Sequence, residues 1–352
     1  MKCSPGIVEG IVIKIEYHSD LKEVQSDEEL ASLLSADRQS APFDRLAWWQ
    51  GLGKHCGLTP LLAIAREGEA VATLALSGGE GHLSALSNWY TFRFRPILSV
   101  GPGGEAMLAI LAVDLVAKAH RLTLSGLPDE DGTASRVEAA FRDAGWIVIR
   151  KICDTNHILP VRGRTYDQYL AARPGKLRTT LKRKEKKVEV QILTRFDESV
   201  WRDYEDIYAE SWKPEEGSPA FLRDFAETEG ASGRLRIGIA RASDDPQRRP
   251  LAAQMWTVEG GTAFIHKLAH REAAKSLSPG SVLSAALFRH VIDVDGVDLV
   301  DFGTGDDSYK RDWMEAARPR YRLEMFRPLA PRNWVVFARI ALRRLAASAK
   351  RG

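Results

Sequence analysis

The stretch of sequence that decides the fold spans residues 251–313 and reads LAAQMWTVEGGTAFIHKLAHREAAKSLSPGSVLSAALFRHVIDVDGVDLVDFGTGDDSYKRDW. Its first part holds two apolar runs, at 251–258 and 262–270, with a Gly-Gly turn between them, which is typical of a β-hairpin. A helix is expected from 279 to about 292, then a strongly apolar strand over 297–302 and a short helix. This order of elements predicts an α/β unit.

The start of the first of these helices is a candidate phosphate site. Ser278 suits the N-cap, Pro279 suits the first helical position, and Gly280 would let a ligand approach closely. Lys275 stands just upstream and Ser281 follows in the first turn. The start of a helix offers unpaired N–H donors and partial positive charge, which suit phosphate. The alternative is an ordinary capped helix.

Five segments, taken in order, carry a family resemblance. They are LSNWYTFRFRP at 86–96, YDQYLAARPGKLRTTLKRKEKK at 166–187, HKLAH at 266–270, SPG at 278–280 and DFGTGDDSYKRDW at 301–313. Together they resemble the CelD-like, or FemAB-like tandem, branch of the GNAT acyltransferase superfamily. The resemblance covers most of residues 40–325.

The resemblance implies an α/β fold of two tandem GNAT-like halves, each with a mixed twisted sheet flanked by helices, joined near residues 155–175. Residues 1–160 are expected to form a degenerate N-terminal half without a cofactor site of its own. Residues 161–328 are expected to form the half that binds acyl-CoA. Residues 329–352 are expected to form a basic amphipathic helix.

Composition sets broad limits on the class of protein. The chain has 352 residues, of which 44% are hydrophobic, so it can bury a sizeable core in two domains. Its net charge of +3 does not demand a nucleic-acid partner, and its three cysteines lie at no metal or redox spacing. No signal peptide and no apolar stretch long enough to span a membrane is visible. A reducing, cytoplasmic setting without a metal is expected.

A basic run occupies the junction between the two expected halves. From 173 to 187 there are eight basic residues and a single acidic one, with leucines at helical spacing. Arg178, Lys182 and Lys186 share one face of this helix. They are candidates for binding cofactor phosphates or lipid headgroups, while the alternative is a solvated helix face.

Candidate catalytic residues come from the resemblance to GNAT folds, in which two adjacent parallel strands splay apart around the pantetheine arm. Here these strands would be 262–270 and 297–302. His266 is a candidate base and Asp301 a residue that orients it or binds the ammonium. Tyr309 would protonate the thiolate, and Lys310 would bind phosphate or acceptor. A buried core histidine and ordinary structural hydrogen bonds are the alternatives.

Two aromatic or basic segments remain. Asn88, Trp89 and Tyr90 could line an acceptor pocket or pack at the interface between the halves. The tail at 332–352 has six basic residues and no acidic one, with a Trp-led apolar stripe. Such a helix is typical of a membrane interface, so an anionic surface of the inner membrane is a candidate partner. A helix docked on its own domain is the alternative.

The sequence therefore predicts an acyltransferase that moves an acyl group from acyl-CoA to an amine. A lipid amine such as a sphingoid base, as in bacterial ceramide synthases, is the sharpest acceptor hypothesis. A sugar or a polysaccharide component is the alternative acceptor within the family. Aminoacyl transfer of the Fem type, or a non-catalytic scaffold, is a further alternative.

Overall fold

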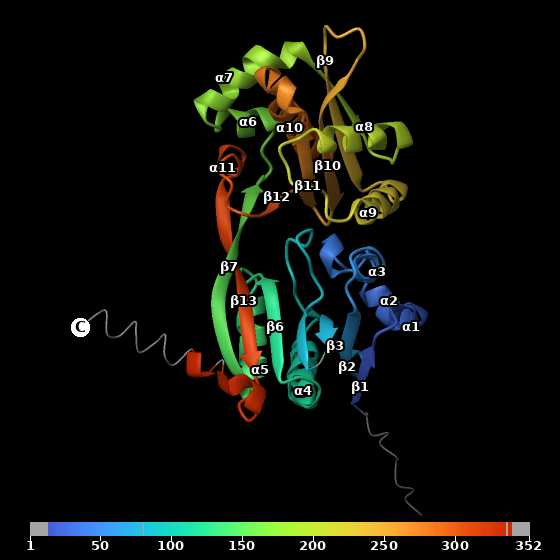
Figure 1. Cartoon of the computed structure of the whole chain (residues 1–352), viewed down its shortest axis with the longest axis vertical. Helices are drawn as coiled ribbons and strands as arrows, with labels where there is room; N and C mark the ends of the chain where they lie inside the picture. The colour runs from blue at the N-terminus through green and yellow to red at the C-terminus, as the bar shows by residue number, and fades with distance from the viewer. Residues whose placement is uncertain (1–12, 80, 336, 340–352) are drawn as a thin grey trace, which may run out of the picture.

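The computed structural model describes residues 13–79, 81–335 and 337–339, which form two α/β halves (Figure 1). The N-terminal half contains β1 (Lys14–His18), α1 (Leu21–Ser26), α2 (Glu28–Leu33), α3 (Leu46–His55), β2 (Pro60–Glu67), β3 (Ala70–Gly79), β4 (His82–Ala85), β5 (Ile97–Leu98), α4 (Pro102–Lys118), β6 (Arg121–Leu127) and α5 (Thr133–Asp143). The C-terminal half contains α6 (Tyr166–Ala171), α7 (Gly175–Lys184), β8 (Val188–Leu193), α8 (Glu198–Ala209), α9 (Pro219–Ala231), β9 (Leu235–Ala242), β10 (Pro250–Glu259), β11 (Thr262–His270), α10 (Pro279–Arg289), β12 (Leu299–Thr304) and α11 (Lys310–Trp313). Two long strands, β7 (Ile147–Pro160) and β13 (Ala316–Phe326), run through both halves.

These strands follow one continuous hydrogen-bonded order, β1-β2-β3-β4-β6-β13-β7-β12-β11-β10-β9-β8, with β5 paired to β3. The prediction of two GNAT-like α/β halves with mixed sheets is confirmed. The sheets of the two halves are continuous with one another, because β7 pairs with β12 of the C-terminal half and with β13, which in turn pairs with β6 of the N-terminal half. The division at residue 160 stays a prediction.

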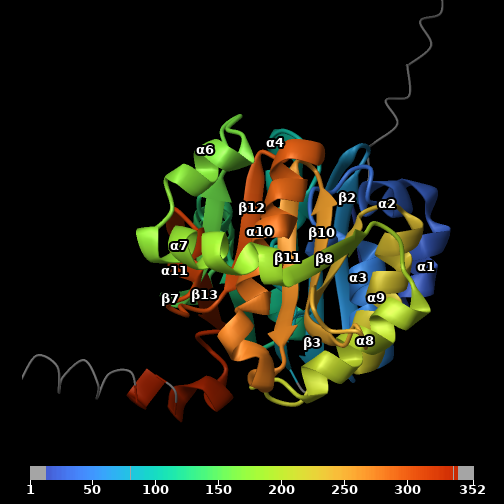
Figure 2. The same cartoon turned by 90° about the horizontal axis from the view of Figure 1, so that it is seen from above.

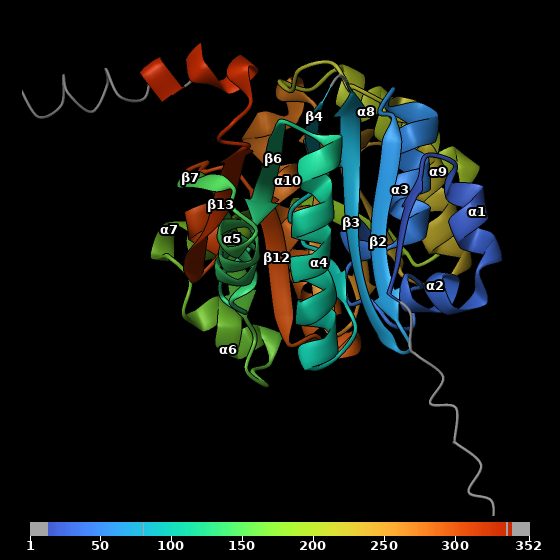
Figure 3. The ribbon, with the colours of Figure 1, turned by 90° about the horizontal axis from the view of Figure 1, so that it is seen from below.

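Helices cover the sheet on its outer faces. In the N-terminal half α4 lies across β2 and β3, with α5 beside it (Figure 3). In the C-terminal half α10 lies across β9 and β10, and α7 packs against α10 (Figure 2). α3 of the N-terminal half and α9 of the C-terminal half pack against one another. None of these helices, within the part of the chain that is described, is long and apolar enough to cross a bilayer.

The stretch 251–313 folds as its pattern predicts. The hairpin is β10 and β11, the helix is α10, and the third strand is β12. The helix begins at Pro279, and a π-helical turn carries it to Val294. The sequence reasoning missed β8 and β13. In β13 the charged residues Arg318, Arg320 and Arg322 alternate with apolar ones, and this period of two was the available signal.

A cluster of aromatic side chains holds the two halves together. Phe43 of the N-terminal half meets Phe264 of β11 with ring centroids 5.6 Å apart. Trp48 of α3 meets Phe221 and Phe225 of α9 at 5.0 and 5.1 Å, both edge to face. Each such pair adds to the free energy of burial because the ring quadrupoles favour this geometry.

A buried ionic cluster lies beside these rings. Arg45, at the start of α3, places its Nη1 2.9 Å from Glu229 of α9 and its Nη2 against Glu259 of β10. The three side chains are at most 5% exposed. Charges buried to this degree are tolerated only when they are paired, so Arg45 fixes the position of one half on the other.

Replacing Arg45 with Met should therefore destabilise the protein strongly. Arg45→Met leaves the buried carboxylates of Glu229 and Glu259 with Arg234 as their remaining basic partner, 2.6 Å from Glu229 but 4.0 Å from Glu259, and we expect a loss of about 3–5 kcal/mol in the free energy of unfolding, measured by urea denaturation. Lys54→Met removes the same charge from an exposed pair with Asp224 and should cost less than about 1 kcal/mol. Equal losses in the two variants would contradict the role of Arg45.

Candidate functional site

The candidate site lies where β11 and β12 part. The two strands run parallel and pair only over Thr262–Phe264 and Leu299–Asp301. β11 then continues to His270 and β12 to Thr304 without further pairing between them. Backbone groups along the gap between two diverging strands are available to a ligand that lies between them. This divergence is the feature expected from the GNAT resemblance.

A β-bulge shapes β11 at the same level. Met255 of β10 pairs with Lys267, while Trp256 pairs with Ile265, so His266 is the additional residue. Successive side chains of a regular strand point to opposite faces, and a bulge changes this. As a result both His266 and Lys267 meet side chains of the N-terminal half.

A cavity of about 180 Å³ opens at the divergence. Residues of β11, of β12 and of the segment before α11 line it, together with two aromatic residues of the N-terminal half and a lysine that precedes α9. The lining residues are Ile265, His266, Lys267, Leu268, Phe302, Gly303, Thr304, Asp307, Tyr309, Lys310, Trp89, Phe92 and Lys213.

His266 is held as a neutral, buried side chain. Its Nε2 lies 2.8 Å from the Thr257 hydroxyl, and its ring lies among Phe43, Phe92 and Phe225 at centroid distances of 5.0–6.1 Å. Burial, followed by the positive charge of Lys267, lowers the pKa of His266 to about 3. The ring is therefore neutral at physiological pH but a weak proton acceptor, which argues against the base role expected from sequence.

Asp301 does not orient His266. Its carboxylate accepts from the Asn156 amide at 2.7 Å and from the Gly303 N–H at 2.8 Å, and it lies 3.3 Å from the Arg318 guanidinium. These contacts tie β12 to β7 and β13. The structure thus separates the histidine and the aspartate that the sequence reasoning paired, and gives Asp301 a set of structural contacts.

Tyr309 and Lys310 both reach the cavity wall from the start of α11. The Tyr309 ring meets Phe302 edge to face at 5.7 Å, and burial raises its pKa to about 12, so the hydroxyl stays protonated at neutral pH. The Lys310 ammonium donates to the Thr304 carbonyl oxygen and lies 5.4 Å from the Phe302 ring. Lys310 therefore closes the turn after β12.

Lys267, Glu216 and Tyr90 form a further polar group here, and only Tyr90 among them was expected from the sequence to line an acceptor pocket. The Lys267 ammonium lies 2.8 Å from the Glu216 carboxylate and 4.7 Å from the Tyr90 ring. The Tyr90 hydroxyl donates to the same carboxylate. Tyr90 was named as an aromatic candidate, but Glu216 stands in a proline- and glycine-bearing loop that has no local pattern. Only the approach of the two halves brings these residues together.

A second cavity, of about 540 Å³, adjoins this polar group. Glu216 lines it, and Lys213 lines both cavities. Most of its other walls are aromatic or apolar side chains of α8, α9 and the loop between them. These are Trp201, Tyr204, Tyr208, Ala209, Pro214, Pro219 and Leu222.

The comparisons with known proteins agree with this geometry. Residues 175–311 match the family model described as acetyltransferase (GNAT) domain. This part of the chain is therefore similar to a GNAT acetyltransferase domain. The match includes α10, the divergence of β11 and β12, and the start of α11. A comparison with curated proteins gives no match.

Solved structures similar to the whole chain share its fold at low identity. The C-terminal domain of a putative lysylphosphatidylglycerol synthetase from Agrobacterium fabrum is 11% identical, with a TM-score of 0.58 over 92% of this chain and 98% of that one. A structure of FemX is 10% identical, with a TM-score of 0.57 over 87% and 96%. L-PGS from Bacillus licheniformis is 13% identical, with a TM-score of 0.51 over 78% and 86%.

The start of α10 is the candidate phosphate site of the GNAT domain. Ser278 adopts a left-handed conformation with φ 52°, and its side chain makes no capping bond. Gly280 has room beside it, because an added Cβ would lie 3.5 Å from the His270 ring. Ser281 donates its N–H to the Ser278 carbonyl at 3.1 Å. The Lys275 side chain is exposed and lies 3.9 Å from Glu272.

Arg178 and Lys182 lie on α7, which packs against α10. Arg178 donates from Nε to the Arg173 carbonyl at 3.1 Å, and Lys182 is exposed. Their role in binding phosphate stays a prediction. Among the described residues no group of His, Cys, Asp and Glu side chains gathers that could hold a metal ion.

The buried state of His266 has a consequence for stability against pH. The unfolded chain binds a proton at His266 near pH 6.5, whereas the folded protein does so only near pH 3. Between these values the unfolded state binds more protons, so the free energy of unfolding should fall on acidification by up to about 1.4 kcal/mol per pH unit from this group.

Urea denaturation of the wild type and of His266→Gln between pH 4 and 7 measures this contribution. Gln can still bond to the Thr257 hydroxyl but does not titrate, so the variant should show the shallower dependence. Equal slopes in the two proteins would mean that His266 is not held neutral.

Proposed function

We propose that the protein is an acyl-CoA-dependent N-acyltransferase whose acceptor is an amine with an apolar chain. The observation that carries this proposal is the parting of β11 and β12 beyond Phe264 and Asp301, with a cavity at the opening and the start of α10 beside it. GNAT domains use acyl-CoA as donor, and the pantetheine arm would lie in this gap. Its phosphates would face Gly280 and Ser281 at the start of α10, where the partial positive charge of the helix terminus favours negative charge.

The chemistry requires three steps from the side chains at the cavity. The acceptor ammonium loses its proton, the amine attacks the thioester carbonyl, and the departing thiolate takes up a proton. In this proposal Glu216 attracts the ammonium and accepts its proton, in place of His266. Tyr309, protonated at neutral pH, donates to the thiolate.

The lipid-amine acceptor is supported by the cavity beside Glu216. Most of its lining residues are aromatic or apolar, which suits an acyl or alkyl chain, while the carboxylates of Glu205, Glu215 and Glu216 suit an ammonium group. A sphingoid base has this combination of groups.

A membrane position for the tail would bring such an acceptor within reach. Most of the basic stripe, 340–352, lies outside the described residues. The segment before it docks on the N-terminal half, since the Asn333 amide donates to the carbonyl oxygens of His120 and Arg327 and Phe337 meets Phe326. Trp334 and Val335 are about 60% exposed beside this anchor.

Aminoacyl transfer is the second candidate function. Two of the similar structures are named for lysylphosphatidylglycerol synthesis, and a third is FemX. Calorimetry with CoA, acetyl-CoA and palmitoyl-CoA, followed by mass spectrometry of products from a sphingoid base in anionic vesicles, separates the candidates. Acyl transfer that weakens when 340–352 are removed supports a lipid amine at a membrane. Absence of binding to all three thioester-related probes would overturn the proposal in favour of another donor.

Donor binding should depend on the start of α10. Gly280→Asp places a carboxylate where phosphate is expected, and we expect CoA affinity to fall by tenfold or more through like-charge repulsion. Gly280→Ala is the matched control, because its Cβ makes only an ordinary contact with His270. Calorimetry with both variants measures the difference. Equal affinity in the two would move the phosphates elsewhere.

Acceptor use should depend on Glu216. Glu216→Gln removes the charge that attracts the ammonium, so KM for the amine should rise by tenfold or more while CoA affinity is unchanged. Glu210→Gln, which changes an exposed carboxylate outside both cavities, should leave KM unaltered. Steady-state kinetics at saturating acyl-CoA decide the question. An unchanged KM in Glu216→Gln would remove Glu216 from the acceptor site.

A further inference from the structure

The N-terminal half repeats the order of the GNAT domain. Antiparallel β2, β3 and β4 are followed by α4 and then by β6, which lies parallel to β4, just as β9, β10 and β11 are followed by α10 and β12. β4 and β6 pair over only three residues each, His82–Ser84 and Arg121–Thr123, before they part. Figure 3 shows α4 across this half.

The N-terminal chain fills part of its own gap. The last residue of β4 pairs with Leu76 of β3. The chain then leaves the sheet and returns as β5, which pairs with the next part of β3, Ile97 opposite Thr73. Phe94, just before β5, donates its N–H to the Gly126 carbonyl of β6 at 3.1 Å. A pantetheine arm could not lie here as it would between β11 and β12.

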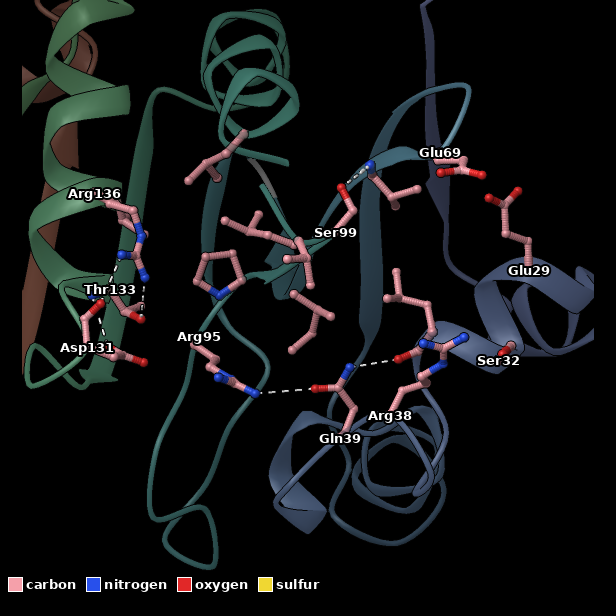
Figure 4. Close-up of a pocket in the computed structure, with 18 residues that line it drawn as sticks. Glu29, Ser32, Arg38, Gln39, Glu69, Arg95, Ser99, Asp131, Thr133 and Arg136 are labelled. Atoms are coloured by element: carbon pink, nitrogen blue, oxygen red, sulfur yellow. Dashed lines mark hydrogen bonds between the residues drawn. The ribbon is translucent and has the colours of Figure 1, made fainter. Parts of the chain in front are cut away.

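A cavity of about 710 Å³ nevertheless remains beyond this closure (Figure 4). Residues 95–100, which include β5, form its floor, and α2 and the start of α5 form its walls. The apolar part of the lining is Leu33, Val71, Pro96, Ile97, Leu98, Val100, Leu108 and Val137. A volume of this size suits a small molecule.

The charges around the cavity are of both signs: Arg38, Arg95 and Arg136 are basic, and Glu29, Glu69 and Asp131 are acidic. Asp131 and Arg136 lie together at the start of α5, where the Arg136 guanidinium donates to the Asp131 carbonyl oxygen at 2.9 Å. Arg95 is fixed by Asp44 at 2.9 Å and by the Gln39 side chain at 3.3 Å, and Arg38 lies beside that glutamine. Glu29 and Glu69 lie together on the side of the cavity away from Arg95, above Arg38 in Figure 4. A ligand with charge of one sign would meet repulsion from one of these groups, whereas a ligand with both charges is attracted by each.

The glycines in the first turn of α4 do not make a phosphate site. A Cβ on Gly103 would lie 2.8 Å from the Ala70 Cβ, and one on Gly104 would lie 2.4 Å from the Ser99 carbonyl oxygen. These glycines are therefore required for packing of α4 against β3 and residue 99, and neither lines the cavity.

We propose that this cavity is a second ligand site, for a small zwitterion with an apolar body such as an apolar amino acid or a dipeptide. Its carboxylate lies at Arg38 and Arg95, its ammonium at Glu29 and Glu69, and its apolar body on β5. The site is independent of the acyl transfer proposed above and contains none of its residues.

Calorimetry of the full chain tests the proposal with L-leucine, L-phenylalanine, L-tryptophan and L-leucyl-L-phenylalanine. At least one should bind with a Kd of roughly 1 mM or tighter. Its amide, which lacks the carboxylate, and its N-acetyl derivative, which lacks the ammonium, should each bind at least tenfold more weakly. Absence of binding by all four zwitterions, or equal binding of the three forms, would overturn the proposal.

Variants locate the site. Arg38→Ala and Glu69→Gln should each weaken binding by tenfold or more, and Leu33→Trp should abolish it by filling the cavity. Arg142→Ala, on α5 but outside the cavity, and Glu216→Gln, in the C-terminal half, should bind as the wild type does. Loss of binding in Glu216→Gln alone would assign the ligand to the acceptor cavity and overturn a site in the N-terminal half.

Discussion

The pairing of β7 with β13 is the constraint on which the rest of the structure depends. These strands are hydrogen-bonded from Ile147 opposite Phe326 to Ile158 opposite Ala316, and they run through both halves. Each half then receives at its centre a strand from the other part of the chain, since β13 pairs with β6 and β7 pairs with β12. Neither half could complete its sheet without a strand from the other part of the chain, which is why the two halves share one continuous sheet. Arg320, fully buried on β13, bonds to Asn156 and Glu130 and so fixes the register of this pairing.

This joining of the halves also completes the candidate site. The segment 86–96 between β4 and β5 leaves the N-terminal sheet after β4, which corresponds to β11, the strand with the bulge, in the C-terminal sheet. It carries Trp89 and Phe92 to the cavity at the divergence, and Tyr90 to the Glu216 carboxylate. The repeat that has closed its own gap thus supplies the walls of the other. The two repeats differ because the N-terminal chain leaves its sheet after β4, whereas β11 continues past its bulge to His270.

The sequence reasoning indicated the elements that surround the cavity, while the catalytic roles that it suggested for their residues stay predictions. It identified β11, β12, α10 and the start of α11, because hairpin turns, helix-start residues and apolar runs are local signals. It expected His266 and Asp301 to act together, yet their side chains point to different partners. The bulge at His266 decides this, and a bulge depends on the strand opposite rather than on the residues that form it. Glu216 and Lys267 could not be found, since their encounter depends on how α8 and α9 pack.

The sequence by itself determined the kind of fold and the order of the elements over residues 251–313. These follow from residue spacing and turn chemistry, which act over a few residues. Only the tertiary structure decided that the sheets are joined, that β13 lies between β6 and β7, and that both a polar group and a second cavity exist. The physical reason is that strand pairing, bulges and burial depend on partners far apart in the chain, such as Arg45 and Glu259. Such pairings leave no local periodicity for a sequence to reveal.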